Sequence, residues 1–487
     1  MVYRCSTRLK NLTGCLVFSF LMSSVLMATT VQAAEPKNVL LILVDDLRPE
    51  LASFGAAYIR SPNIDQLASR GTSFHQHFVN APSCGPSRFT LLTGRFGEPN
   101  NTALFTRAKA MKKTPDEVAA SMPEWFRERG FTTVSVGKVS HHPGGRGGKK
   151  WNDPKQVEMP GAWDRHLMPS GPWEHPRGAM HGLASGANRT KDKSPVLQAV
   201  EGPDSIYPDG LIVDEALKQL DLVTEDKSKP FFLAVGLIKP HLPFGCPKKY
   251  LDLYDGVTLP EIPHPEKPNG LSTWHDSWEF FRQYSMGGKD PRTDQKFADK
   301  VRRHYAACVS YADASVGRII KRLKETGADK DTLIILWGDH GWNLGEHNIW
   351  GKHNLFDEAL RSPLIFVEPG DAKAQQKSNA IVETLDIFPT ICDLMGVPKP
   401  DFVEGTSLAP MLEDPSLPGR TAVSYTNQIR TLRTKTHRLT VHGEGEYELY
   451  DHTSPEKETK NIAQESPELV KQLNAQLNER LPQVRKR

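Results

Sequence analysis

The segment NVLLILVDD, residues 38–46, decides the fold of this chain. Its first seven residues are almost all apolar, as is typical of a strand buried on both faces of a parallel sheet, and two carboxylates follow directly. Similar apolar runs recur at residues 131–136, 231–237 and 333–337. Each leads into charged or imidazole side chains, which are Lys138, then Lys239 and His241, then Asp339 and His340. The sequence therefore predicts four buried strands with polar ends.

Helical patterns lie between these strands. Residues 209–222 precede the third run and residues 301–323 precede the fourth, and Gly327 is expected to end the second helix. Strands that alternate with helices indicate an α/β fold with a large, mostly parallel central sheet flanked by helices. Because such folds bind ligands beyond the carboxyl ends of the strands, we expect the polar strand ends to converge at one edge.

The chain changes character near residue 400. A helix is expected over residues 381–395, and beyond residue 420 come alternating runs at 430–442 and 447–450 and a polar helix at 467–480. This pattern predicts a large α/β domain at 34–400 and a small C-terminal subdomain at 401–487, an antiparallel sheet with one helix.

Two stretches, 144–191 and 260–291, lack clear periodicity and are expected to be long loops. The glycine-rich segment 144–149 is expected to be a mobile basic loop, because no Ser or Thr follows it as in a phosphate-binding loop.

The N-terminus has the pattern of a secretory signal peptide. Arg4, Arg8 and Lys10 precede an apolar run at residues 16–27, and residues 31–33 provide a cleavage site. The run is shorter than the roughly 20 residues that a spanning helix needs, so we expect export to the periplasm or medium without a stable membrane anchor. Removing residues 1–33 lowers the formal net charge from +3 to about 0, which gives no general attraction to nucleic acid.

Four cysteines remain after the signal peptide, too few and too widely spaced for a disulfide framework. Cys308 and Cys392 are expected to be buried thiols, and Cys246 either to pair or to stay free. Cys84 differs, because Pro86 marks the first turn of a helix that begins beside it. A helix N-terminus stabilises negative charge, either a thiolate or a sulfate oxygen. A cysteine hydrolase would also need a histidine base, and the sequence places none beside Cys84.

A metal site is expected at the ligand-binding edge of the sheet, where the sequence gathers Asp45, Asp46, Asp339 and His340. Carboxylates placed together without a cation would repel one another. Oxygen ligands suit calcium or magnesium better than zinc. Asp45 and Asp46 alone would equally fit a helix cap or turn, but the second polar pair after another strand favours a cation.

The motif Cys84-x-Pro86-Ser87-Arg88, followed by LTGR at residues 92–95, resembles the signature of the type I sulfatases of the alkaline-phosphatase superfamily. In that family an installing enzyme oxidises the cysteine to formylglycine. The resemblance covers residues 38–397 and implies an alkaline-phosphatase-like fold and a sulfuric ester hydrolase. Segments 45–49, 61–68, 137–139, 239–244 and 339–342 are similar to the iduronate-2-sulfatase group of exo-sulfatases.

The resemblance implies that calcium, with magnesium as the alternative, is held by the four strand-end residues named above together with the modified Cys84. Arg88 would brace the formylglycine. One hydroxyl of the hydrated aldehyde would attack sulfur while the sugar alcohol leaves, and the second hydroxyl would then expel sulfate.

The resemblance also assigns two lysines and two histidines to the reaction. Lys138 and Lys352 would neutralise sulfate oxygens. His241 would protonate the leaving oxygen, and His141, with His142 as the alternative, would accept the proton that is released as the aldehyde is regenerated.

Two other functions fit the residues. A phosphomonoesterase or phosphodiesterase uses the same scaffold, although such relatives usually keep a Ser or Thr nucleophile and two zinc ions. A non-catalytic binder of sulfated glycans would keep the fold without oxidation of Cys84. The substrate stays open between uronate 2-sulfates of glycosaminoglycans and sulfated sugars of algal polysaccharides, since residues 96–103 depart from the iduronate-2-sulfatase pattern. His175, His181 and His264 are expected to be ordinary loop histidines.

Overall fold

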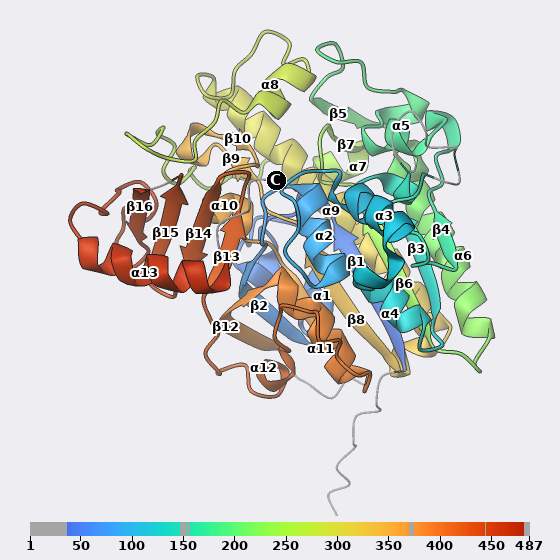
Figure 1. The fold of residues 1–487 in the computed structure, drawn as a ribbon. Helices are drawn as coiled ribbons and strands as arrows, with labels where there is room; N and C mark the ends of the chain where they lie inside the picture. The colour runs from blue at the N-terminus through green and yellow to red at the C-terminus, as the bar shows by residue number, and fades with distance from the viewer. Residues whose placement is uncertain (1–36, 147–152, 154–155, 370–374, 444, 482–487) are drawn as a thin grey trace, which may run out of the picture. The chain divides into compact units, whose positions relative to one another are not determined.

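The computed structural model describes residues 37–146, 153, 156–369, 375–443 and 445–481, and the predicted signal peptide lies outside them. An eight-stranded sheet forms the centre of the fold, in the order β12-β2-β11-β8-β1-β6-β3-β4 (Figure 1). Its strands are β1 (Asn38–Val44), β2 (Thr72–Phe78), β3 (Thr132–Gly137), β4 (Arg165–Leu167), β6 (Phe231–Leu237), β8 (Thr332–Gly338), β11 (Leu364–Val367) and β12 (Gln376–Glu383). All pairings are parallel except those of β11, which runs antiparallel to β2 and β8.

Helices cover both faces of the sheet. Alternate residues of β1 point to opposite sides, and since all of them are apolar except Asn38, each face needs a cover. Leu40, Ile42 and Val44 belong to a core shared with α1 (Pro62–Ala68), α6 (Pro208–Glu225) and α9 (Gln295–Glu325). Val39, Leu41 and Leu43 belong to the other core, shared with α2 (Cys84–Thr93), α3 (Ala103–Lys113), α4 (Met122–Arg127) and α11 (Ile387–Leu394). The predicted fold class is confirmed, and the four predicted strands are the neighbours β8, β1, β6 and β3.

The helix expected over residues 381–395 is wrong in its first part. Residues 381–383 belong to β12, which pairs in parallel with β2, and α11 begins only at Ile387. Ile381 and Val382 are β-branched and fit a strand as well as a buried helix, so the apolar run did not mark the boundary. Cys246, Cys308 and Cys392 are buried free thiols.

The C-terminal residues form a four-stranded antiparallel sheet with one helix, as predicted. It consists of β13 (Ala422–Tyr425), β14 (Ile429–Arg433), β15 (His437–His442), β16 (Glu446–Asp451) and α13 (Pro467–Arg480). The expected run at 430–442 is two strands joined by a turn. Arg433 and Arg438 form ion pairs with Asp357 of α10 (Asp357–Leu360), which tie this sheet to the α/β body. The described residues from 37 onward belong to one compact unit, and the boundary at residue 400 stays a prediction.

Short elements lie above the central sheet in Figure 1. The expected loop at 144–191 contains β4 and α5 (Pro176–Met180), and the one at 260–291 contains α8 (Trp278–Gln283). Of the glycine-rich segment, residues 147–149 lie outside the described ranges. The remaining elements are α7 (Lys248–Leu251), α12 (Ala409–Glu413), the pair β5 (Leu197–Val200) and β7 (Phe244–Pro247), and the hairpin β9 (Asn343–Leu344) and β10 (Trp350–Gly351).

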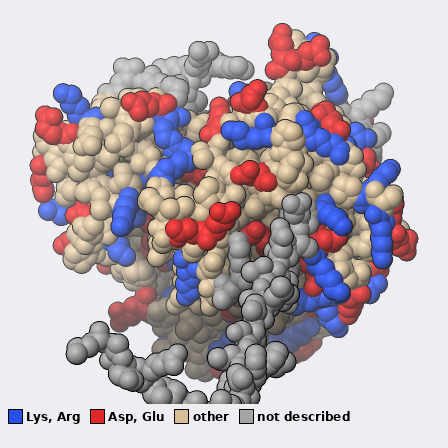
Figure 2. Space-filling model, turned by 90° about the horizontal axis from the view of Figure 1, so that it is seen from below, with Lys and Arg blue, Asp and Glu red and all other residues tan. Residues whose placement is uncertain are grey.

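The surface carries charges of both signs. On the face shown in Figure 2, acidic and basic side chains are interspersed. Among the described residues, no helix is both long and apolar enough to span a membrane.

Candidate functional site

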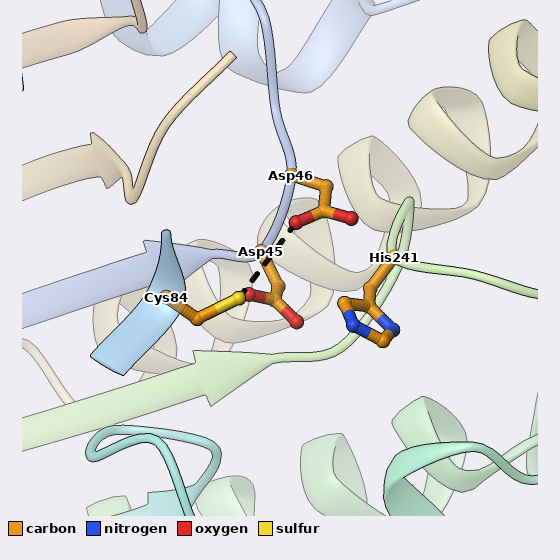
Figure 3. Close-up of side chains that lie close together, drawn as sticks. All are labelled: Asp45, Asp46, Cys84 and His241. Carbon is orange, nitrogen blue, oxygen red and sulfur yellow. Dashed lines mark hydrogen bonds between the residues drawn. The ribbon is translucent and has the colours of Figure 1, made fainter. Parts of the chain in front are cut away.

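The polar strand ends converge at one edge of the sheet, as predicted. Asp45 and Asp46 follow β1, and Asp339 follows the neighbouring strand β8. Asp339 Oδ1 accepts a hydrogen bond from the backbone N–H of Asp46 at 2.8 Å. Asp46 adopts a left-handed backbone conformation with φ of 57°, which turns the chain at this point. One side-chain N, O or S atom from each of Asp45, Asp46, Cys84 and His241 lies within 4.8 Å of the others (Figure 3).

Cys84 lies at the first residue of α2, as the sequence indicated, and Gly94 ends this helix in a left-handed conformation. The backbone N–H of Gly85 donates to Asn101 Oδ1 at 3.0 Å. A Cβ on Gly85 would lie 2.4 Å from Asn101 Cα, so only glycine fits there. The start of α2 is thereby fixed against the segment at 96–103.

Cationic and imidazole groups surround the Cys84 sulfur. Lys352 Nζ and His340 Nε2 each lie 3.3 Å from Sγ, and Lys138 Nζ lies 3.8 Å away. Burial and the charge of Asp45 nevertheless raise the pKa of the thiol well above its usual value. Of the two anions expected at this helix N-terminus, a thiolate or a sulfate oxygen, this pKa disfavours the thiolate of the unmodified side chain. His340 lies beside the sulfur, next to which the family resemblance placed it as a ligand of the same cation.

Arg88 holds two of the carboxylates in place from α2. Its guanidinium lies 3.0 Å from Asp45 Oδ1 and 3.0 Å from Asp339 Oδ2, and all three side chains are fully buried. It also donates to the backbone carbonyls of Lys138 and Val139. A planar guanidinium with five donors suits such a bridging position between the ends of three strands.

The three aspartates differ in the charge that their surroundings favour. Burial would raise the pKa of Asp45, but Lys138, His241 and Arg88 outweigh it and hold that pKa well below 3.8. Burial, with the charge of Asp45 adding to it, raises the pKa of Asp46 to about 6 and that of Asp339 to about 7. Two of three gathered carboxylates thus resist ionisation.

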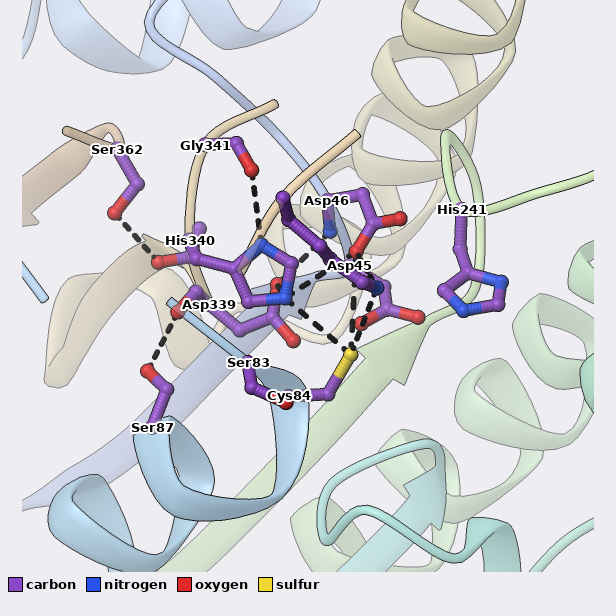
Figure 4. A network of polar contacts seen from close by, with 12 residues as sticks. Asp45, Asp46, Ser83, Cys84, Ser87, His241, Asp339, His340, Gly341 and Ser362 are labelled. Atoms are coloured by element: carbon purple, nitrogen blue, oxygen red, sulfur yellow. Dashed lines mark hydrogen bonds and ion pairs between the residues drawn. The ribbon is translucent and has the colours of Figure 1, made fainter. Parts of the chain in front are cut away.

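These residues fit a divalent cation. Asp46 Oδ2 is buried without a hydrogen-bond partner. His340 Nδ1 lies 2.9 Å from the Gly341 carbonyl and donates to it, which leaves Nε2 as a lone pair aimed at Cys84 and the carboxylates (Figure 4). Burial and Lys352 lower the pKa of His340 to about 4, so the ring is neutral. A neutral imidazole oriented by a carbonyl beside buried carboxylates is a common arrangement of metal ligands.

The histidines predicted to transfer protons, His241 and His141, are both buried. His241 is buried, and its Nδ1 lies 2.7 Å from the Leu242 carbonyl, so Nε2 faces the site. Burial and Lys138 hold its pKa well below 6.5. His141 is buried with Nδ1 unpartnered, whereas His142 is hydrogen-bonded to Glu158 at 2.8 Å. The assignment of His141, with His142 as the alternative, stays a prediction.

Two residues near the cluster were missed from the sequence. Glu279 of α8 lies 3.9 Å from Lys352 Nζ, 3.3 Å from His353 Nε2 and 4.0 Å from His241 Nε2. His181, expected to be an ordinary loop histidine, is buried with its ring centroid 5.3 Å from that of His241. Both lie in segments without hydrophobic periodicity, so the sequence gives no signal for them. Only their contacts in the folded structure identify them.

Comparisons with known proteins agree with this geometry. A family profile described as Sulfatase matches residues 37–397, and one described as N-sulphoglucosamine sulphohydrolase, C-terminal, matches residues 345–487. Human iduronate 2-sulfatase is 36% identical over 391 residues, which cover 77% of this chain and 68% of the human protein.

Two solved structures share the fold. The phosphonate monoester hydrolase of Agrobacterium radiobacter is 22% identical with a TM-score of 0.70, covering 91% of this chain and 95% of its own. A protein solved in complex with D-glucosamine-2-N,6-O-disulfate is 21% identical with a TM-score of 0.69, covering 91% and 97%. At these identities the likeness concerns the fold alone.

Proposed function

The chain belongs to the sulfatase family, and from this premise we propose that it removes sulfate from a sulfated carbohydrate as an exo-sulfatase of the iduronate-2-sulfatase kind. The observation that carries the proposal is the position of Cys84 at the N-terminus of α2, with Lys138 and Lys352 Nζ both within 4 Å of its sulfur. The 36% identity to human iduronate 2-sulfatase supports the narrower assignment.

Formylglycine made from Cys84 would supply, as its hydrate, a hydroxyl that attacks sulfur and a second hydroxyl that releases sulfate. Lys138 and Lys352 flank the position of Sγ and would neutralise sulfate oxygens as the S–O bond to the sugar breaks. His241 Nε2 would donate a proton to the departing sugar oxygen, and His141 would take up the proton released later. Arg88 keeps Asp45 and Asp339 in position.

Asp45, Asp46, Asp339 and His340, with the modified residue 84, would hold calcium or magnesium. The bound cation would polarise the sulfate group. With Glu279 included, the four carboxylates of the site exceed its three basic side chains by one formal charge, so a divalent cation would leave a net positive charge for an anionic sulfate ester. The neutral ring of His340 and the unpartnered Asp46 Oδ2 support this assignment.

Export through the signal peptide at 1–33, maturation by a formylglycine-installing enzyme and the division into domains at 34–400 and 401–487 are part of the same proposal. The basic and apolar pattern of the N-terminus supports export.

Paired aryl sulfate and aryl phosphate substrates test the proposal. We expect the purified exported protein to have the higher kcat/KM for 4-nitrophenyl sulfate and to lose it in the Cys84→Ala variant. A preference for 4-nitrophenyl phosphate would support the phosphoester hydrolase instead, and no turnover of either ester would support a glycan binder.

A further inference from the structure

Two arginines near the candidate site have no anionic partner. Arg189 is half-buried and Arg177 is exposed. Neither Arg177 of α5 nor Arg189 forms an ion pair with a carboxylate among the residues that the structure describes. The charge of Arg189 acts on Arg177, and two neighbouring guanidinium groups that lack a carboxylate partner favour the binding of an anion.

A line of contacts connects this pair to the candidate site. Arg189 Cζ lies 5.4 Å from the centroid of the Tyr284 ring, and the Tyr284 hydroxyl lies 3.3 Å from His181 Nδ1. The His181 ring in turn packs against that of His241, with centroids 5.3 Å apart. Arg177 lies four residues before His181, in the short helix that ends there.

The electrostatics of His181 agree with this arrangement. Burial lowers its pKa well below 6.5, and Arg189, Lys138 and Arg177 lower it further. Burial and the charge of Arg189 likewise lower the pKa of Arg177. The charges of Lys138, in the sulfate cluster, and of the two arginines therefore all act on the His181 ring. Glu279 is the nearby carboxylate, but it is held by Lys352 and His353.

We propose that Arg177 and Arg189 form a second anion-binding subsite, which takes a carboxylate or a second sulfate of the substrate. The proposal rests on the proposed sulfatase function and deepens it by naming the substrate class. Because the subsite is reached through His181 and His241, and His241 would protonate the leaving oxygen, the second anion belongs to the sugar that leaves. A guanidinium binds carboxylate and sulfate oxygens in a bidentate manner, so either group suits it.

The test compares substrates with and without the second anion in the full, exported protein. One pair is a 2-sulfated uronate disaccharide and its uronate methyl ester, and the other is a neutral sugar carrying two sulfates or one. 4-Nitrophenyl sulfate is the common reference. The variants are Arg177→Gln, Arg189→Gln and the double variant, with Arg318→Gln as the control, since Arg318 is half-exposed and paired with Asp214 on the surface.

We expect the double variant to lower the ratio of kcat/KM for the doubly anionic substrate to that for 4-nitrophenyl sulfate by at least about tenfold, mostly through KM. Arg318→Gln should leave the ratio unchanged. A fall confined to one substrate pair assigns the subsite to that anion. A folding defect would lower both activities together and leave their ratio unchanged, so a change in the ratio reports on the subsite. An unchanged ratio in the folded double variant overturns the proposal.

Calorimetric titration with the desulfated uronate sugar gives a second readout that needs no turnover. The parent protein should bind this sugar, or the neutral sugar that keeps its second sulfate, at least about tenfold more tightly than the double variant does, and equal affinities for both sugars overturn the subsite. A parent protein that binds the sugar but turns over no sulfate ester contradicts only the proposed function.

Discussion

Replacing Lys352 by methionine removes the ammonium group nearest to the Cys84 sulfur and keeps most of the side-chain volume. Lys352 Nζ lies 2.7 Å from Asp46 Oδ1, and the lysine side chain is 2% exposed. Breaking a buried ion pair by removing one partner costs about 3–5 kcal/mol of folding free energy. We expect the lower end, because burial already raises the pKa of Asp46 to about 6, so the carboxyl group that loses Lys352 can take up a proton. Since domains are stable by about 5–15 kcal/mol, the variant should stay folded.

Because the Lys352→Met variant stays folded, its lower stability alone should reduce kcat little. We nevertheless expect a large fall in kcat. Removing one preorganised donor to a developing anion lowers kcat by about 10²–10³. kcat/KM for 4-nitrophenyl sulfate, with urea unfolding followed by circular dichroism, measures both effects. Lys352→Arg keeps the charge, and Lys248→Met removes an exposed lysine as a control. A folded Lys352→Met protein with kcat/KM within about threefold of the parent would refute the assigned role.

Three further changes test other parts of the site. His241→Ala should slow a sugar sulfate far more than 4-nitrophenyl sulfate, whose leaving group needs no proton, and equal losses would contradict the role as acid. Because burial raises the pKa of Asp46 to about 6 and of Asp339 to about 7, from 3.8, the metal-free protein should lose stability as the pH rises from about 4 to 7. Calcium should reverse that trend in urea titrations, and a metal-free protein that gains stability over this range would contradict it. Gly85→Ala should abolish turnover of 4-nitrophenyl sulfate, because its Cβ would lie 2.4 Å from Asn101 Cα, and a parent-like rate would count against a fixed start of α2.

The centre of the fold and the sheet edge that gathers the carboxylates could be predicted because both depend on local patterns. The run at 38–44 is fully buried in β1, and parallel pairing with β6 and β8 brings the residues that follow each strand together. The position of Asp45 beside Asp339 follows from this topology alone. Lys352 has no such pattern, because it follows the short hairpin β9–β10, and only the family resemblance pointed to it.

The remaining features depend on contacts between segments that are distant in the sequence. β11 runs antiparallel between β2 and β8, and nothing in its four apolar residues indicates that direction. Glu279 and His181 reach the site from aperiodic segments, where neither hydrophobic period nor strand ends give a position. The raised pKa of the Cys84 thiol follows from burial and Asp45, and burial by distant segments has no local signature.

Mass spectrometry of the peptide that contains Cys84 and ends at Arg88, taken from protein exported by its host, tests the central claim most directly. The account predicts a peptide in which an aldehyde replaces the CH₂SH group of Cys84, in proportion to the sulfatase activity of each preparation. Peptide with only the unmodified thiol, in protein that hydrolyses sulfate esters, would contradict the formylglycine mechanism. The same peptide in inactive protein would leave a binder of sulfated glycans as the function.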